Sequence, residues 1–412
     1  MDTQAYYVNY DRSCLRAERA RHLWRLPYST LLEFGISSYR DITELDTIGI
    51  PVWVAYRPPS TSISVTCGKS IDPLLAFAGA ITEALEFWAA ENPKDSPCTL
   101  CAYSRLKEKT EAEHLALEDY PLARDNIIDE QTPIAWELVT KLGAGAKTVW
   151  MPSNVIWLVD RAQAQFQDVQ QSSNGLAAGC TLEDALLQAI YELVERDGWT
   201  INEHIREVTG RFPRKINLAN LPSELADLVA KMRAAGCHPF LFDCKSNLEI
   251  PVIGCALFDD DNVGTFGGYG CHLSPRVAAG RALTEAAQSR LCYISGARDD
   301  LYRRDFLLMK RSSSKWIVSQ LEALKPTYRT WAEYPAKYES FNSVRDELME
   351  LVKILTNQRI DLYYKTLHTL ELGGESVVVV KAIAPKLEGV WCGSWQTTGR
   401  ATSHLANELG TT

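Results

Sequence analysis

Acidic side chains recur in this 412-residue chain at one fixed helical spacing. Two alanines four residues apart are followed at intervals of three by Glu and then by Glu or Gln. The copies are Ala76, Ala80, Glu83, Glu86; Ala185, Ala189, Glu192, Glu195; and Ala278, Ala282, Glu285, Gln288. Residues three or four apart share a helix face, so each copy presents paired oxygen ligands while its alanines allow close packing.

If the three helix ends meet, their carboxylates repel one another by ~1 kcal/mol for two charges about 4 Å apart in water, and by more in a drier site. A buried cluster therefore requires cations. Ligation by oxygen alone favours Mg²⁺, and a di-iron site is disfavoured because no copy contains Glu-x-x-His. Three arginines adjoin the acids and could neutralise them or hold phosphates: Arg196, Arg281 and Arg290. The alternative is that the acids are surface residues of unrelated helices.

A bound nucleotide would explain both the metal and the arginines, although the usual motifs are absent. CGKS at 67–70 lacks the first glycine of a P-loop, and GTFGGYG at 264–270 lacks the dinucleotide-binding spacing. ATP would therefore bind through metal-bridged carboxylates and through the turn amides of Ser173, Asn174 and Gly175.

The elements that must position these residues are strands alternating with amphipathic helices. Apolar, β-branched runs predict strands at 51–56, 61–67, 149–159, 251–258, 361–367 and 376–384. We expect a solvated helical face over 104–119 and a packed helix over 344–358. This pattern predicts a mixed α/β (α+β) fold.

No linker divides the chain, so we expect one domain over 1–412. The copies lie too far apart for a solenoid repeat of about 20–50 residues, and each follows a glycine-containing turn. We therefore predict three related helix-bearing lobes around a central nucleotide site. The domain would comprise an N-terminal segment 1–34, a nucleotide-binding core 35–300 and C-terminal helices and strands over 301–412.

Composition excludes several classes of protein. A net charge of −9 argues against a general affinity for nucleic acid or anionic membrane. The N-terminus is polar and no later run approaches the length of a membrane span, which predicts a cytoplasmic protein. Eleven cysteines without disulfide-scaffold density indicate free thiols, and the lone CxxC of Cys98 and Cys101 has no second pair for zinc.

Three stretches together resemble the YcaO superfamily: RDITELDTIGIPVWVAYRP (40–58), SNGLAAGCTLEDALLQAIYELVERD (173–197), and GYGCHLSPRVAAGRALTEAAQSR followed by GARDD (268–300). The run SVVVVKAIAPKLEG resembles the C-terminal region of that family. The resemblance implies an ATP-dependent enzyme that phosphorylates a backbone amide oxygen of a peptide and so makes its carbonyl carbon open to attack.

The resemblance also implies roles for individual residues. The expected Mg²⁺ ligands are Glu83, Glu86, Asp184, Glu192 and Glu195. The expected ATP-binding residues are Ser173, Asn174, Gly175, Asp184, Gln288, Arg290 and Arg298. Catalytic roles are expected for Glu192, Glu195, Arg196 and Arg290.

The sequence departs from the family pattern in the first lobe. Gly79 and Phe87 stand where relatives usually carry serine and arginine, and Ser38 stands where many carry arginine. These changes affect the phosphate contacts of that lobe and leave its metal ligands in place.

Two enzymatic branches remain open for the attacking nucleophile. Azoline-forming relatives use a Cys, Ser or Thr side chain of the substrate and commonly end in Pro-x-Pro-x-Pro, whereas this chain ends ATSHLANELGTT. The difference favours the branch that makes thioamides with a TfuA partner and an external sulfur donor. His272 is a candidate general base or a structural histidine, and Cys67 and Cys271 are candidate sulfur carriers or buried thiols.

Binding partners follow from the same resemblance. We expect a precursor peptide as substrate, recruited by a separate TfuA-like or E1-like protein because no leader-binding domain is fused to the chain. A homodimer is also expected. The non-enzymatic alternative is a YcaO-like scaffold that binds nucleotide or a partner without turnover.

Overall fold

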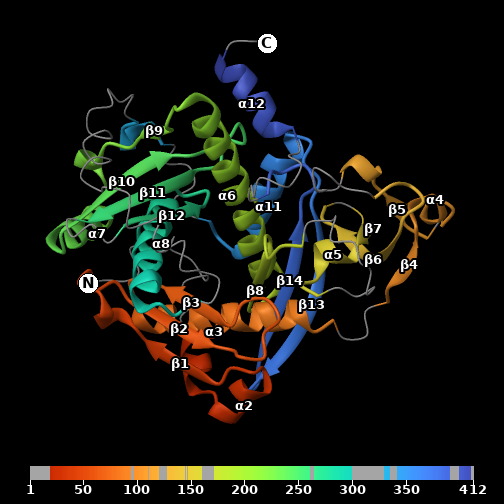
Figure 1. Cartoon of the computed structure of the whole chain (residues 1–412), viewed down its shortest axis with the longest axis horizontal. Helices are drawn as coiled ribbons and strands as arrows, with labels where there is room; N and C mark the ends of the chain where they lie inside the picture. Colours follow the sequence, from red (N-terminus) through yellow and green to blue (C-terminus); the bar gives the residue numbers. More distant parts are fainter. Residues whose placement is uncertain are drawn as a thin grey trace. The chain divides into compact units, whose positions relative to one another are not determined.

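The computed structural model describes residues 19–93, 97–109, 111–119, 128–143, 145, 147–159, 171–259, 264–298, 329–334, 341–389 and 399–409. Helices and β-sheets are mixed within them, which confirms the predicted fold class. The chain divides into two compact units assembled from separated segments (Figure 1). Unit 1 comprises Met1–Pro59, Ile63–Ala84 and Phe212–Ser343, and unit 2 comprises Ser60–Ser62, Leu85–Arg211 and Val344–Thr412. The expected organisation as one domain over 1–412 stays a prediction.

The described residues of unit 1 form two antiparallel sheets. The first has the order β1 (Ser38–Asp41), β2 (Val52–Tyr56), β3 (Val65–Lys69), and the second β12 (Thr265–Cys271), β11 (Val252–Asp259), β10 (Cys237–Asp243), β9 (Arg214–Lys215). Its described helices are residues 19–25, α2 (Tyr28–Glu33), the first part of α3 (Pro73–Glu91), α7 (Ser223–Ala234) and α8 (Pro275–Ser295), with 3-10 turns at Thr43–Leu45, Leu218–Asn220 and Trp331–Glu333. Helices α7 and α8 bury a shared aliphatic core with the second sheet.

Unit 2 is built on a seven-stranded sheet. Its order is β5 (Glu113–His114), β7 (Thr148–Pro152), β6 (Pro133–Lys141), β13 (Tyr363–Leu372), β14 (Glu375–Ile383), β8 (Leu176–Gly179), with β4 (Thr99–Ala102) also paired to β6. The helices are α4 (Tyr103–Leu106), α5 (Ser153–Ile156), α6 (Leu182–Thr209), α11 (Val344–Asn357) and α12 (Arg400–Leu409), with a 3-10 turn at Leu117–Asp119. Helix α6 packs along β8 and β14, and α11 and α12 pack against α6 (Figure 1).

Most predicted elements agree with the observed ones. Strands β2, β3, β11, β13 and β14 fall within or beside the predicted runs, and α11 occupies the predicted helix over 344–358. The spacing of apolar residues explains the correct prediction of α11, which buries Leu348, Leu351 and Leu355 on one face. The helix predicted over 104–119 was wrong. The described residues of that segment form α4, β5 and a 3-10 turn, and β5 pairs in parallel with β7.

The run 149–159 also differs from its prediction of one continuous strand. Strand β7 ends at Pro152, and the short helix α5 follows over Ser153–Ile156. Proline fixes its own φ and lacks an N–H, which ends the strand and suits the start of a helix.

Each copy of the repeated pattern packs on a glycine of the strand before it. A Cβ atom added at Gly68 of β3 would overlap the carbonyl oxygen of Ala76, and one at Gly179 of β8 would overlap the N–H of Ala185. One at Gly268 of β12 would overlap the carbonyl oxygen of Ala282. These glycines lie in strands rather than in the turns that the sequence suggested, and they bring helix and strand backbones into direct contact.

Replacing Gly268 with alanine should lower the free energy of unfolding by about 2 kcal/mol, since the new methyl group must push α8 away from β12. Gly267 on the same strand is the matched control, because a Cβ there has no neighbour within 4 Å and the residue is exposed. Urea unfolding of both variants measures the difference. Equal stability of the two variants would contradict the packing described here.

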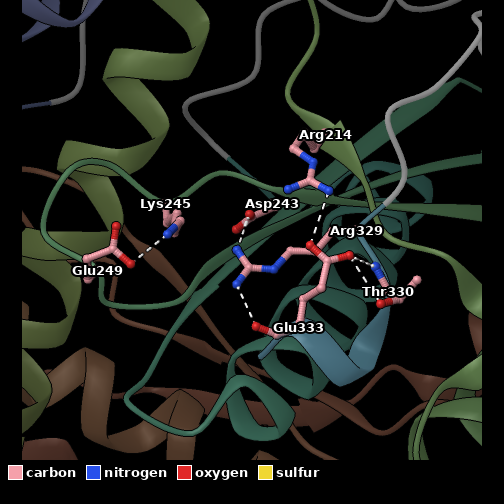
Figure 2. A network of polar contacts seen from close by, with 7 residues as sticks. All are labelled: Arg214, Asp243, Lys245, Glu249, Arg329, Thr330 and Glu333. Atoms are coloured by element: carbon pink, nitrogen blue, oxygen red, sulfur yellow. Dashed lines mark hydrogen bonds and ion pairs between the residues drawn. The ribbon is translucent and has the colours of Figure 1, made fainter. Parts of the chain in front are cut away.

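A polar network fixes the segment 329–334 to the second sheet of unit 1 (Figure 2). The Arg329 guanidinium bonds to the Asp243 carboxylate and donates to the Glu333 carbonyl oxygen at 3.2 Å. The Glu333 carboxylate accepts from Arg214 at 3.2 Å and from the Thr330 N–H at 2.7 Å. The Arg329 and Asp243 side chains are 10% and 5% exposed, so this ion pair is largely removed from water.

Helix α3 corrects one expectation from the sequence. Among the described helices it alone is long and apolar enough to cross a membrane by length and composition, with a mean hydropathy of 1.2. The expectation that no run approaches the length of a span was therefore wrong. The apolar composition serves packing, since 56% of the 18-residue stretch is buried inside the protein.

Candidate functional site

In unit 1, α3 and α8 both bind the backbone of Cys67 on β3. The Cys67 N–H donates to Glu83 Oε2 at 2.8 Å, and Gln288 Nε2 donates to the Cys67 carbonyl oxygen at 2.8 Å. One strand residue thus fixes a side chain from each of two copies of the repeated pattern. The side chains of Glu83 and Gln288 therefore bind the same residue of β3, and both are only half-buried.

The same strand also neutralises Glu285, the acid of α8 in the repeated pattern. Lys69 Nζ lies 2.5 Å from Glu285 Oε2, and the two side chains are 27% and 28% exposed. Sequence reasoning overlooked Lys69 because it belongs to the rejected P-loop-like stretch. Arg298 follows α8 directly and is half-buried, and its predicted contact with nucleotide stays a prediction.

Arg290 is enclosed by two carboxylates of unit 1. Its Nε lies 3.1 Å from Asp46 Oδ2, and its Nη1 bonds to Asp259. The guanidinium also lies over the Phe266 ring, 5.6 Å from its centroid. These partners give Arg290 a structural role within unit 1, and the phosphate contact predicted for it stays a prediction.

Gly79 departs from the serine common in relatives for a visible reason. A Cβ atom at Gly79 would lie 3.2 Å from the Cα of Gly68, tighter than most contacts of that kind. Two glycines therefore face each other where α3 crosses β3. The substitution fits close backbone packing and leaves the hydrogen bond of Glu83 in place.

In unit 2, Glu86 is held by the strand that precedes α6. Its Oε1 accepts a hydrogen bond from the Ala178 N–H of β8 at 2.7 Å. Glu83 and Glu86 lie one turn apart on the same helix, so α3 presents two carboxylates along one face. Backbone N–H groups therefore orient both carboxylates.

Helix α6 carries the second acidic pair and a neighbouring arginine. Glu192, Glu195 and Arg196 are half-buried, and Arg196 Nη2 lies 3.8 Å from Glu192 Oε1. The Arg196 guanidinium also lies 5.0 Å from the centroid of the Trp199 ring. A helix with one buried face therefore keeps its acids at the edge of that face, where a ligand can still reach them.

Asp184 has an observed structural function at the start of α6. Thr181 is the N-cap and its side chain accepts from the Asp184 N–H at 3.2 Å, while Asp184 Oδ2 accepts from the Cys180 N–H at 3.2 Å. This reciprocal arrangement satisfies donors at the helix N-terminus. Asp184 is 1% exposed, and its predicted part in binding Mg²⁺ stays a prediction.

The turn before β8 is held by a lysine that sequence reasoning overlooked. Lys381 on β14 is 3% exposed, and its Nζ donates to the carbonyl oxygens of Ser172 and, at 2.7 Å, of Asn174. Burial lowers the pKa of Lys381 to about 8, against the opposing charge of Glu192. The available signal was a single lysine inside the apolar run SVVVVKAIA.

The conformation of this turn depends on Gly175. Its φ is +78°, and a Cβ there would overlap the carbonyl oxygen of Ala382. The Ala382 N–H in turn donates to the Gly175 carbonyl oxygen at 2.8 Å, and the Leu176 N–H donates to Ser173 O at 2.8 Å. Ser173, Asn174 and Gly175 therefore form one rigid turn beside α6.

An unsatisfied acceptor in this turn fits a bound polar ligand. Asn174 Oδ1 is buried and has no hydrogen-bond partner among the described residues. An amide oxygen in that position can accept from a hydroxyl group or ligate a hard cation. Within the described part of the chain, no three His, Cys, Asp or Glu side chains form a metal-binding group. Mg²⁺ ligation by Glu83, Glu86, Glu192 and Glu195, like the meeting of all three helix ends, stays a prediction.

Two lesser candidates have structural explanations. His272 is 3% exposed, and its Nδ1 accepts the Ser274 N–H at 2.9 Å, which favours the structural histidine over the general base. Cys98 is exposed and Cys101 is half-buried, and they belong to no metal-binding group among the described residues.

Comparison with known proteins places these features in a family. A family model described as YcaO cyclodehydratase, ATP- and Mg²⁺-binding, matches residues 67–388. An uncharacterized protein in the tfuA 3' region of Rhizobium leguminosarum bv. trifolii is 33% identical over 302 residues, covering 71% of this chain and 70% of that protein.

Two solved structures share the fold. YcaO from Methanopyrus kandleri, bound with AMPPCP and Mg²⁺, has a TM-score of 0.69 at 19% identity and covers 91% of each chain. A heterocyclase in complex with substrate and cofactor has a TM-score of 0.71 at 20% identity, covering 89% of this chain and 53% of that one.

Proposed function

The chain belongs to the YcaO family, and from this premise we propose that it converts a backbone amide of a ribosomally made peptide into a thioamide. Members of the family are ATP-dependent peptide-modifying enzymes, and ATP and Mg²⁺ are the cofactors. The amide oxygen takes the terminal phosphoryl group of ATP, and a sulfur nucleophile such as sulfide then displaces phosphate from the carbon. The balanced products are thioamide, ADP and phosphate.

One observation carries the thioamide assignment. The rhizobial relative, 33% identical over most of its length, is named for its position beside tfuA. A TfuA-like protein is therefore the proposed partner that brings the sulfur donor or the precursor peptide. We also propose a homodimer in the cytoplasm.

In this proposal the residues of the site bind the metal, bind the nucleotide or stabilise charge. Glu83, Glu86, Glu192, Glu195 and Asp184 would hold Mg²⁺, which when bound supplies positive charge to the transferring phosphoryl group. The turn at Ser173, Asn174 and Gly175 would bind nucleotide, together with Gln288 and Arg298. Arg196 would stabilise the developing negative charge next to Glu192.

The second candidate function is an azoline-forming cyclodehydratase that uses a side chain of the substrate as nucleophile. The description of the matching family model and the fold shared with a heterocyclase favour it. A TfuA-like partner would not be needed, and an E1-like protein would recruit the peptide instead. The third candidate, a scaffold without turnover, would show no ATP hydrolysis with any donor.

Product mass separates these functions. The purified protein is incubated with ATP, Mg²⁺, sulfide and a candidate precursor peptide. A TfuA-like or an E1-like protein is added, and both the peptide and this partner are chosen from the genes next to the gene of this chain. Replacement of oxygen by sulfur adds about 16 Da, while azoline formation removes about 18 Da of water. A gain in peptide mass that requires both sulfide and ATP supports the proposal. A loss of water from the peptide that does not depend on sulfide supports the cyclodehydratase. An unchanged peptide mass with no phosphate release supports the scaffold.

A further inference from the structure

Two thiols of unit 1 lie in direct contact beside Glu83 and Gln288. Cys67 Sγ on β3 and Cys292 Sγ on α8 are 3.1 Å apart. The two elements pack against each other, and both residues are free cysteines. A disulfide needs its sulfurs about 2.05 Å apart, so a movement of about 1 Å would bring these two to bonding distance.

The surroundings suit a reaction between the two sulfurs. A sulfenic acid is attacked by a neighbouring thiol to give a disulfide. Cys67 is half-buried whereas Cys292 is 2% exposed, so Cys67 is the thiol that an oxidant from solvent reaches first.

We propose that Cys67 and Cys292 form a disulfide when a hydroperoxide oxidises unit 1, and that this bond weakens the binding of ATP. Cys67 first takes one oxygen atom from the peroxide, which leaves as water, and becomes a sulfenic acid. The Cys292 sulfur then attacks Cys67 Sγ, the S–O bond breaks and hydroxide leaves as a second water. Two thiols and one hydrogen peroxide thus give one disulfide and two waters.

The expected effect on ATP binding follows from the hydrogen bonds that the Cys67 backbone makes. Its N–H orients Glu83, its carbonyl oxygen accepts from Gln288, and Gln288 lies one helical turn before Cys292. Drawing α8 toward β3 by about 1 Å must change at least one of these hydrogen bonds. We expect this change at Glu83 or Gln288 to weaken the binding of ATP about tenfold. The inference needs only that the chain binds ATP, and it holds for a thioamide-forming or an azoline-forming enzyme.

Peptide mapping tests the bond in the full-length Cys98→Ser protein, which lacks the exposed thiol of the Cys98/Cys101 pair. The protein is treated with hydrogen peroxide or dithiothreitol, alkylated, digested without reduction and analysed by mass spectrometry. We expect one linked species that joins the peptides of Cys67 and Cys292 and is about 2 Da lighter than their sum. Both cysteines alkylated as free thiols after peroxide treatment would overturn the proposal.

Calorimetric titration tests the consequence. The dissociation constant of ATP with Mg²⁺ should rise about tenfold in the oxidised Cys98→Ser protein and return after dithiothreitol. When Cys292→Ala is added to the Cys98→Ser protein, peroxide should leave the dissociation constant of ATP unchanged. Cys292→Ser replaces it in this test if the alanine variant folds poorly. A complete Cys67–Cys292 bond with unchanged ATP affinity would refute the regulatory effect. Peptide mapping of the Cys98→Ser protein decides the bond independently of either cysteine variant.

Discussion

Replacing Glu192 with glutamine is expected to lower ATP-dependent phosphate release by about 100-fold. The substitution keeps the shape of the side chain and removes the charge that lies 3.8 Å from Arg196 and acts on Lys381. Loss of one preorganised charged or hydrogen-bonding group typically lowers a rate by about 100- to 1,000-fold. The measurement is phosphate release with peptide, partner and sulfide, alongside calorimetric titration of ATP in the presence of Mg²⁺.

Glu203→Gln is the matched control for this variant. Glu203 lies on the same helix, and its carboxylate pairs with Arg206 at 2.5 Å, away from the predicted ligands. Its activity should stay within about twofold of the unaltered protein, because a half-exposed ion pair on a helix contributes little. If both glutamine variants lose activity equally, or if Glu192→Gln keeps full activity, Glu192 has no special part in the site.

The stability of unit 2 should rise with pH through the action of Lys381. Burial lowers its pKa from 10.5 to about 8 in the folded protein. Between these values the unfolded chain holds a proton that the folded chain has already released, so alkaline pH favours folding. The stabilisation is absent below pH 8 and complete above pH 10.5, and the shift corresponds to ~3 kcal/mol.

Urea unfolding at several pH values from 7.5 to 10.5 measures this effect, expressed as the difference between the unaltered protein and Lys381→Met. The difference cancels the contributions of other groups that titrate in the same range. Lys353→Met, which removes an exposed lysine of α11 in the same unit, is the control. A difference that is constant with pH for Lys381→Met would contradict the pKa of about 8.

Local pattern was enough to predict the α/β class and several elements. The spacing of alanines and acids predicted three helices that pack closely, and the contacts of Ala76, Ala185 and Ala282 with strand glycines explain that packing. The apolar, β-branched runs predicted β2, β11 and β14 because residues of this kind favour buried strands. Signals of this kind depend only on neighbouring residues.

The remaining features depend on partners far away in the chain. Lys381 reads as an anomaly in an apolar strand until its contacts with Ser172 and Asn174 are known. Asp197 on α6 is fully buried and binds Arg400 at 2.9 Å, a pairing that no local spacing indicates. Arg290 was predicted to hold phosphate because it sits beside the repeated acids, and only the fold reveals Asp46 and Asp259 next to it.

The glycines at 68, 179 and 268 bear on how the chain can change through evolution. Because backbone packs directly on backbone at each crossing, the distance of each carboxylate-bearing helix from its strand is set by van der Waals contact between backbone atoms, which every sequence shares. Side chains elsewhere can drift without moving the carboxylates. Lineages could therefore exchange one peptide substrate for another while the phosphate-handling apparatus kept its dimensions.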